Sequence, residues 1–340
     1  MDVYRRNLMK GALAGSTLLT LGIPPIATAA ASAGKPGRLR LLLGGGAADA
    51  EFAAGARTAF AANARRAATG HGATTASEAR TAQGGLEVIK LKDGLLNEYE
   101  EVAHLLATFR DTRWIAVMDD GSAAVFTELV RNAGGSLLSL GSHASSSETG
   151  VRGMGVRVPA LRHVWAAASP LHAAGGILAA RLVQTRRSFS IVENFFSTHG
   201  TEERGAVTES PPGFLAWRLD GAGPGPRHDP AHLYCAGVSP ADGCKLLGWD
   251  ATPAWTPVSQ ESGHQTATSR KGRSAPGNDE AHAGGWAEAV GYAVVAAALG
   301  AEAGCESSSV RAHVYQSDGV KRGAPSLYKP GGFTSFVIDI

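Results

Sequence analysis

Short apolar runs alternate with amphipathic helical patterns through the first half of this chain, and no other feature constrains the fold as tightly. Five runs have the length and composition of buried strands, and they occupy residues 38–45, 86–91, 113–120, 136–143 and 162–168. The stretches that follow them place apolar residues at helical spacing, as in Phe52, Ala56 and Phe60. Strands that alternate with such helices form parallel β-α-β units. We therefore predict an α/β fold in which residues 36–196 form a doubly wound parallel sheet with helices on both faces.

The second half of the chain, residues 197–340, is less regular and predicts a more irregular α+β arrangement. Residues 251–285 are rich in Ser, Thr, Gly and Pro, so this long polar stretch is predicted to be a loop. Beyond it, residues 286–301 have a helical pattern, and residues 308–316 and 333–340 have strand patterns. The sequence leaves open whether these strands join the first-half sheet or form a separate one.

The N-terminus has the organisation of an export signal. The segment RRNLMK, residues 5–10, resembles the twin-arginine motif R-R-x-[FL]-[LM]-K and matches each of its fixed positions. An uncharged apolar run follows over residues 11–26, and small residues then alternate in the segment ATAAASA. Cleavage after Ala29, Ala31 or Ala33 fits this pattern, and we favour Ala33 because a polar linker follows it.

Residues 1–33 are thus predicted to be a twin-arginine signal peptide. This makes the twin-arginine translocase a partner during export and the periplasm, or the medium beyond it, the destination. The route carries folded proteins, either because a cofactor is inserted before export or because the chain folds too fast to be threaded. The sequence identifies no cofactor, so it does not decide between these reasons.

Charge and hydropathy argue against two classes of partner. The formal net charge is +2, and removal of residues 1–33 brings it to neutrality. Nucleic-acid-binding proteins carry a basic face, so we predict that this protein does not bind nucleic acid. The longest apolar run after the signal, residues 286–299, is short and contains Glu288, which favours a buried helix. No stable membrane span is therefore predicted after cleavage.

The expected ligand site follows from the predicted topology. In open parallel sheets, ligands bind beyond the carboxyl ends of the strands, and this rule selects the loops at 44–49, 91–96, 119–122 and 142–147. Six residues in these loops are predicted to contact a small molecule: Gly45, Asp119, Asp120, Ser122, Ser142 and His143. Ser122 and the unpaired amides of its helix would hold an anionic group, and Asp119 an amine. The alternative is that Asp120 or Ser122 only caps the helix.

The first half also resembles a known family. The segments WIAVMDDGSAAVF, AGGSLLSLGSHAS and WAAASPLHAAG follow one another with the order and spacing of the first lobe of type I periplasmic solute-binding proteins, the branched-chain amino-acid-binding group. In that family, a serine at a helix start holds the ligand carboxylate, so the resemblance implies that Gly121 and Ser122 contact ligand. The resemblance covers roughly residues 38–196, and no second lobe is recognisable after it.

Two further motifs are incomplete. The segment LLLGGGAADAEF resembles a dinucleotide-binding loop, but Asp49 replaces the third glycine, and its carboxylate would repel a pyrophosphate. Asp49 is instead predicted to cap the following helix. His228, His232 and Cys235 have a spacing that metal sites use, but Pro230 interrupts them and a strand pattern follows. We therefore predict no metal site there.

The three cysteines suggest one disulfide. Cys235 and Cys244 flank the turn-rich segment AGVSPADG, and an exported protein reaches an oxidising compartment, so a bridge between them is predicted. Pairing of either residue with Cys305 is the alternative.

These observations support three functional hypotheses. The first is an exported small-molecule-binding protein or a derivative of that fold. The second is an exported enzyme with a metal or organic cofactor, although no G-x-S-x-G or H-E-x-x-H motif occurs after the signal. The third is an accessory protein of an exported complex. A complete second lobe would favour ligand binding by hinge closure, whereas a single domain with converging His and Cys would favour an enzyme.

Overall fold

The computed structural model describes residues 38–69, 85–145, 161–195, 210–211, 213–219, 231–249, 255–258, 285–300, 310–317 and 331–340. The predicted signal peptide, His228, Cys305 and most of the polar stretch 251–285 lie outside these residues.

All eleven strands in the described part of the chain belong to one continuous sheet. They are β1 (Arg38–Leu43), β2 (Glu87–Lys90), β3 (Thr112–Met118), β4 (Ser136–Ser145), β5 (Leu161–Ala167), β6 (Phe189–Phe195), β7 (Leu215–Leu219), β8 (Ala231–Ala236), β9 (Thr256–Pro257), β10 (Val310–Tyr315) and β11 (Gly331–Asp339). Their order across the sheet is β2-β1-β3-β11-β4-β5-β6-β10-β8-β7-β9. Strands from the two halves of the sequence thus share a single sheet.

The sheet is mixed, and this corrects the prediction of a parallel first half. β2, β1 and β3 are parallel neighbours as expected. The last strand of the chain, β11, then lies antiparallel between β3 and β4. β4 and β5 also pair antiparallel, whereas β5 and β6 are parallel. The sequence showed where these strands are but not which strands pair, because a strand of either direction has the same apolar pattern.

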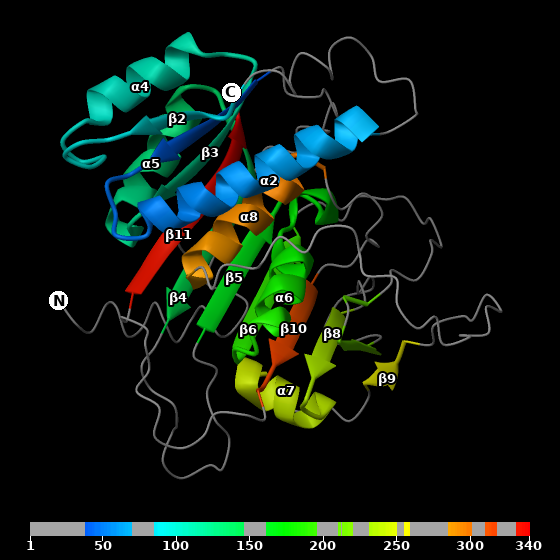
Figure 1. The fold of residues 1–340 in the computed structure, drawn as a ribbon. Helices are drawn as coiled ribbons and strands as arrows, with labels where there is room; N and C mark the ends of the chain where they lie inside the picture. Colours follow the sequence, from blue (N-terminus) through cyan, green and yellow to red (C-terminus); the bar gives the residue numbers. More distant parts are fainter. Residues whose placement is uncertain are drawn as a thin grey trace.

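In the described residues, six α-helices and a short 3₁₀ helix cover both faces of the sheet (Figure 1). They are α2 (Asp49–Thr69), α4 (Tyr99–Thr108), α5 (Asp120–Asn132), η2 (Pro170–His172), α6 (Gly175–Gln184), α7 (Pro240–Leu247) and α8 (Trp286–Ala298). Helices α2, α8 and α6 pack on one face over the largest apolar core. On the other face, α4 and α5 cover β1, β3 and β11, and α7 covers β8 and β10. Helix α7 was not predicted, because its segment PADGCKLL contains the Pro and Gly that usually mark turns.

Helices α2 and α8 run side by side with their backbones in contact (Figure 1). A Cβ atom added at Gly55 of α2 would overlap the carbonyl oxygen of Glu288, and one added at Gly291 of α8 would overlap the carbonyl oxygen of Phe52. Glycine at these two positions therefore allows a separation that no larger residue permits. Most of the α8 side chains are buried, which confirms the prediction of a buried helix. Within the described residues, no helix has both the length and the apolar character needed to cross a membrane.

The α2–α8 contact gives a testable prediction. We expect Gly55→Ala to lower the free energy of unfolding by about 1–3 kcal/mol, since overpacking outweighs the ~1 kcal/mol that alanine gains over glycine in a helix. Urea denaturation followed by circular dichroism measures the change. Gly85→Ala is the control, because nothing lies within 4 Å of a Cβ added there. A Gly55→Ala variant as stable as the wild type would contradict the close approach.

Candidate functional site

The loops that follow β1 and β3 lie next to each other, as predicted. The amide of Gly44 donates to the carbonyl of Val117 at 2.8 Å, so the glycine loop runs beside the end of β3. Asp119 and Asp120 follow β3 directly and are exposed. Gly45, Asp119, Asp120 and Ser122 therefore belong to one region at the carboxyl ends of the parallel strands.

Asp119 is the N-cap of α5. Its Oδ1 accepts the amides of Gly121 and Ser122 at 2.9 and 3.0 Å, and its Oδ2 accepts the Ser122 hydroxyl at 2.7 Å. The Ser122 hydroxyl bond, together with the two amides, lowers the pKa of Asp119 although partial burial opposes this. The structure thus shows a capping arrangement, with Asp119 in the role that we considered for Asp120 or Ser122. The amides expected to hold an anionic ligand are already paired with a carboxylate of the chain itself.

Asp49, the first residue of α2, accepts an amide of the neighbouring glycine loop. Its Oδ2 accepts the Gly45 amide at 2.9 Å. Burial raises the pKa of Asp49, while the Gly45 and Gly46 amides and the charge of Lys90 act to lower it. A carboxylate therefore occupies the position where a dinucleotide-binding loop would place a phosphate. Asp49 is the first residue of α2 and bonds to the loop before it, which differs from the predicted role as the cap of that helix.

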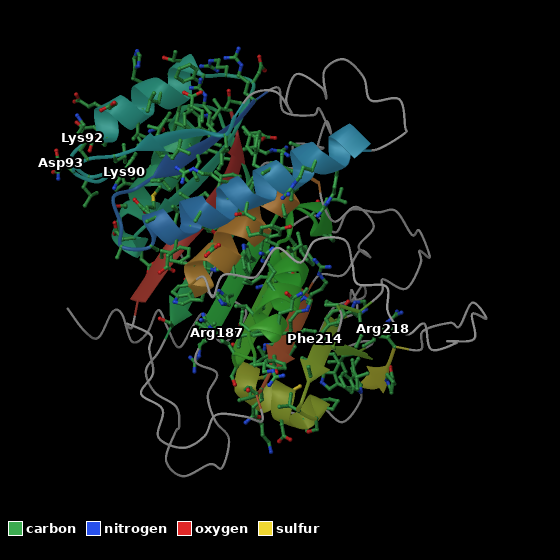
Figure 2. The ribbon with its side chains drawn as sticks, viewed as in Figure 1. Lys90, Lys92, Asp93, Arg187, Phe214 and Arg218 are labelled. Atoms are coloured by element: carbon green, nitrogen blue, oxygen red, sulfur yellow. The ribbon has the colours of Figure 1, made fainter. Side chains whose placement is uncertain are left out.

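The loop after β2 contains a third carboxylate that accepts a backbone amide. The amide of Asp93 donates to Glu98 Oε1 at 2.6 Å. Figure 2 shows Asp93 with Lys90 and Lys92 where the chain leaves β2, on the side of the molecule that carries α4. In each of the loops that follow β1, β2 and β3, a carboxylate of the chain itself therefore accepts a backbone amide.

The last strand adds a residue that the sequence did not suggest. Thr334 of β11 lies opposite Met118 of β3 and Ser142 of β4. Its hydroxyl donates to Asp120 Oδ1 at 2.8 Å. Asp120, Thr334 and Ser142 therefore form a polar group, which we call the strand-end site, on the sheet face that carries α5. Asp120 and Thr334 are 214 positions apart, so no local pattern could have linked them.

His143 is not part of this site, contrary to the prediction. Neighbouring residues of a strand point to opposite faces, so Ser142 and His143 cannot face the same ligand. His143 points into the α2–α8 core, where its Nε2 lies 2.7 Å from Ser335 Oγ and its Nδ1 lies 3.0 Å from Nδ1 of His163. The rings of Trp165 and Phe333 pack against it, with centroids at 4.6 and 5.0 Å.

The buried polar groups continue across the same face of the sheet. Glu193 on β6 forms an ion pair with Arg311 of β10 at 3.1 Å, and His313 Nε2 lies 3.5 Å from the same oxygen. The first amide of α6, that of Gly175, donates to Glu193 Oε1 at 2.5 Å. Burial opposes ionisation of Glu193, but Arg311, His313 and the Gly175 amide together hold its pKa below the usual range. This carboxylate therefore fixes the start of α6 on the sheet.

The Ser335–His143–His163 chain has the order of nucleophile, base and orienting group that covalent catalysis uses. All three residues are buried, with exposed fractions of 1% each. Burial lowers the pKa of His163 to about 3, and burial with the nearby His163 lowers that of His143 well below its usual value. Both rings are therefore neutral in the folded protein. A serine so deep in the core cannot meet a substrate, so we assign this chain to internal hydrogen bonding.

The residues considered for metal binding do not converge. His232 and Tyr234 of β8 lie on the sheet face that also carries Arg311 of β10, whereas Cys235 packs on the opposite face against α7. His228 lies outside the described residues. In the part of the chain that is described, no three His, Cys, Asp or Glu side chains are grouped to hold a metal ion.

The predicted Cys235–Cys244 bridge is absent from the structure. Both residues are buried and both are free thiols, although they share one small apolar cluster between β8 and α7.

Comparison with known proteins adds no relative: no family model, no curated protein and no solved structure matches this chain.

The buried histidines predict acid sensitivity. The pKa of an unfolded histidine is about 6.5, so below that pH the unfolded chain binds protons that the folded chain excludes. The unfolding free energy therefore keeps its full value above pH 6.5, where neither state binds these protons. It decreases as the pH falls from 6.5 toward 3, because only the unfolded chain binds them in that range. We expect the His163 ring to remove about 2 kcal/mol of unfolding free energy between pH 7 and pH 5, and the His143 ring, whose pKa is also lowered, to act in the same direction.

Urea titrations at a series of pH values measure this dependence. His163→Gln should reduce the slope of the unfolding free energy against pH by the amount that corresponds to about one bound proton. His104→Gln, a change at an exposed histidine, should leave the slope unchanged. Equal slopes in the wild type and the His163 variant would show that this ring is not held neutral.

Proposed function

We propose that this protein is exported in folded form and binds a small solute through a cationic group at the strand-end site. The observation that carries the proposal is the hydrogen bond from Thr334 to Asp120 Oδ1, 2.8 Å long, which orients an exposed carboxylate at the end of β3. Ser142 is exposed one strand away, opposite Thr334. A directed carboxylate beside two hydroxyl groups is a site for a ligand that donates hydrogen bonds.

The surrounding loops favour a cation over an anion. Asp119 occupies the amides at the start of α5, and Asp49 occupies those of the glycine loop. An anionic ligand would have to displace a carboxylate from the same amides and would meet its charge. An ammonium group needs only acceptors, and Asp120 Oδ2 and the Ser142 hydroxyl supply them. This proposal therefore assigns the amine-binding role to Asp120 in place of Asp119, and it abandons the anion-binding role of Ser122.

The sequence supports the export part of the proposal. The RRNLMK segment and the apolar run after it have the pattern of a twin-arginine signal, and the first half resembles periplasmic solute-binding proteins. The enzyme alternative receives less support, since the chain with catalytic order, Ser335–His143–His163, is closed off from solvent.

Two aspartate variants test the binding site. Putrescine, L-lysine, L-arginine and choline are titrated into the mature protein by calorimetry, with acetate and phosphate as anionic controls. Asp120→Asn should weaken the tightest cation by about 10- to 100-fold, the range for loss of a hydrogen bond to a charged group. It should change the melting temperature little, because Asp120 is exposed.

Asp119→Asn is the matched control, one residue away. It should lower the unfolding free energy by about 1 kcal/mol through a weaker cap and leave affinity nearly unchanged. Binding of phosphate or acetate in preference to every cation would overturn the proposal, as would equal affinities in the wild type and the Asp120 variant.

A further inference from the structure

Cys235 of β8 and Cys244 of α7 lie in one apolar cluster and are both buried from solvent. Cys235 and Cys244 are each 1% exposed and pack with Leu233, Leu246 and Val314. A Cβ atom added at Gly243 would lie 2.8 Å from Cys235 Sγ, so α7 touches β8 beside the two thiols. The thiols are also close enough for Cys244 to contribute to the raised pKa of Cys235.

The local chain imposes this proximity. Ser239 caps α7 by accepting the Asp242 amide at 3.2 Å, and its hydroxyl donates to Asp242 Oδ2 at 2.8 Å. This cap turns the chain back immediately after β8 and places the second turn of α7 over it. Eight residues separate the two cysteines in the sequence, so the unfolded chain also brings them together often.

Folding removes both requirements for thiol oxidation. Thiol–disulfide exchange needs a thiolate and an approaching disulfide. Burial raises the pKa of Cys235 to about 12, with Cys244 as a second cause, and burial raises that of Cys244 although Trp255 acts in the opposite direction. The burial that suppresses the thiolates also keeps an oxidising protein away from the sulfur atoms.

We propose that Cys235 and Cys244 are a redox pair whose state is set by the compartment in which the chain folds. A chain that folds in a reducing compartment encloses two thiols and keeps them after export. A chain that folds in an oxidising compartment forms a Cys235–Cys244 disulfide before α7 closes over β8. The first case rests on the folded export proposed above.

The oxidation is a balanced exchange with a disulfide of an oxidising protein or a small molecule. One cysteine thiolate attacks that disulfide and releases one of its sulfur atoms as a thiol. The second cysteine thiolate then attacks the mixed disulfide, so the Sγ–Sγ bond forms and a second thiol is released. The pair loses two electrons and two protons, and the attacked disulfide gains them.

The first experiment separates folding from export. Mature protein with Cys305→Ser, which leaves two thiols, is incubated with oxidised glutathione in the folded state and in urea. We expect the folded protein to react at least ~100-fold more slowly with glutathione and with a maleimide. We expect the chain in urea to form the Cys235–Cys244 disulfide, identified by peptide mapping. Rapid reaction of the folded protein, or two free thiols after incubation in urea, would overturn the proposal.

The second experiment follows the full chain in cells, in the same Cys305→Ser background. One precursor keeps its own signal, and a second precursor carries a signal for the general secretory route, which delivers unfolded chains. Periplasmic protein is denatured in acid and its thiols are counted with a maleimide. The natural signal should give two thiols and the replaced signal none before reduction; the reverse pattern would refute the proposal.

A signal variant separates failure of this proposal from failure of the export proposal. Arg5→Lys with Arg6→Lys should retain the natural precursor in the cytoplasm. If that variant is exported normally, folded export is wrong, and the glutathione experiment alone then decides whether folding seals the pair.

Discussion

The insertion of β11 between β3 and β4 is the constraint on which the rest of the structure depends. Three consecutive residues of this strand serve three purposes. Phe333 packs against Phe52 with centroids 5.9 Å apart and joins the sheet to α2. Thr334 donates to Asp120 on one face, and Ser335 pairs with His143 on the other. The final strand therefore organises the strand-end site and the buried histidines together, and a shift of one residue would exchange their faces.

Elements with local causes were predictable from the sequence. The strands of the first half, α2 and α8 follow from apolar periodicity, whereas Asp49, predicted to cap α2, is its first residue and holds the preceding glycine loop. The pairing of strands was not predictable, because β11 forms hydrogen bonds with strands from the distant first half of the chain. The sequence did not indicate helix α7, because its Pro240 and Gly243 are residue types that are common in turns. In the structure Pro240 occupies the first turn of this helix, a position that proline tolerates.

The candidate site shows the same division. Placing Asp119, Asp120 and Ser122 at a strand end needed only the β3–α5 junction, and the structure agrees. Their chemistry depends on hydrogen bonds that spacing does not reveal. Asp119 is committed to the helix amides, so the neighbouring Asp120, oriented by a distant threonine, becomes the available carboxylate. His143 was misplaced by treating two adjacent strand residues as if they shared a face.

Cross-linking in the folded protein tests the central claim most directly. In the structure Ser142 faces Thr334 across one strand gap, whereas β11 separates Ser142 from Met118. Neighbouring strands lie about 4.8 Å apart, and a disulfide needs Cα atoms within about 7 Å. Ser142→Cys with Thr334→Cys should therefore form a disulfide under mild oxidation, and Ser142→Cys with Met118→Cys should not. A bridge in the second pair and none in the first would contradict this account, because it would mean that β3 and β4 are direct neighbours.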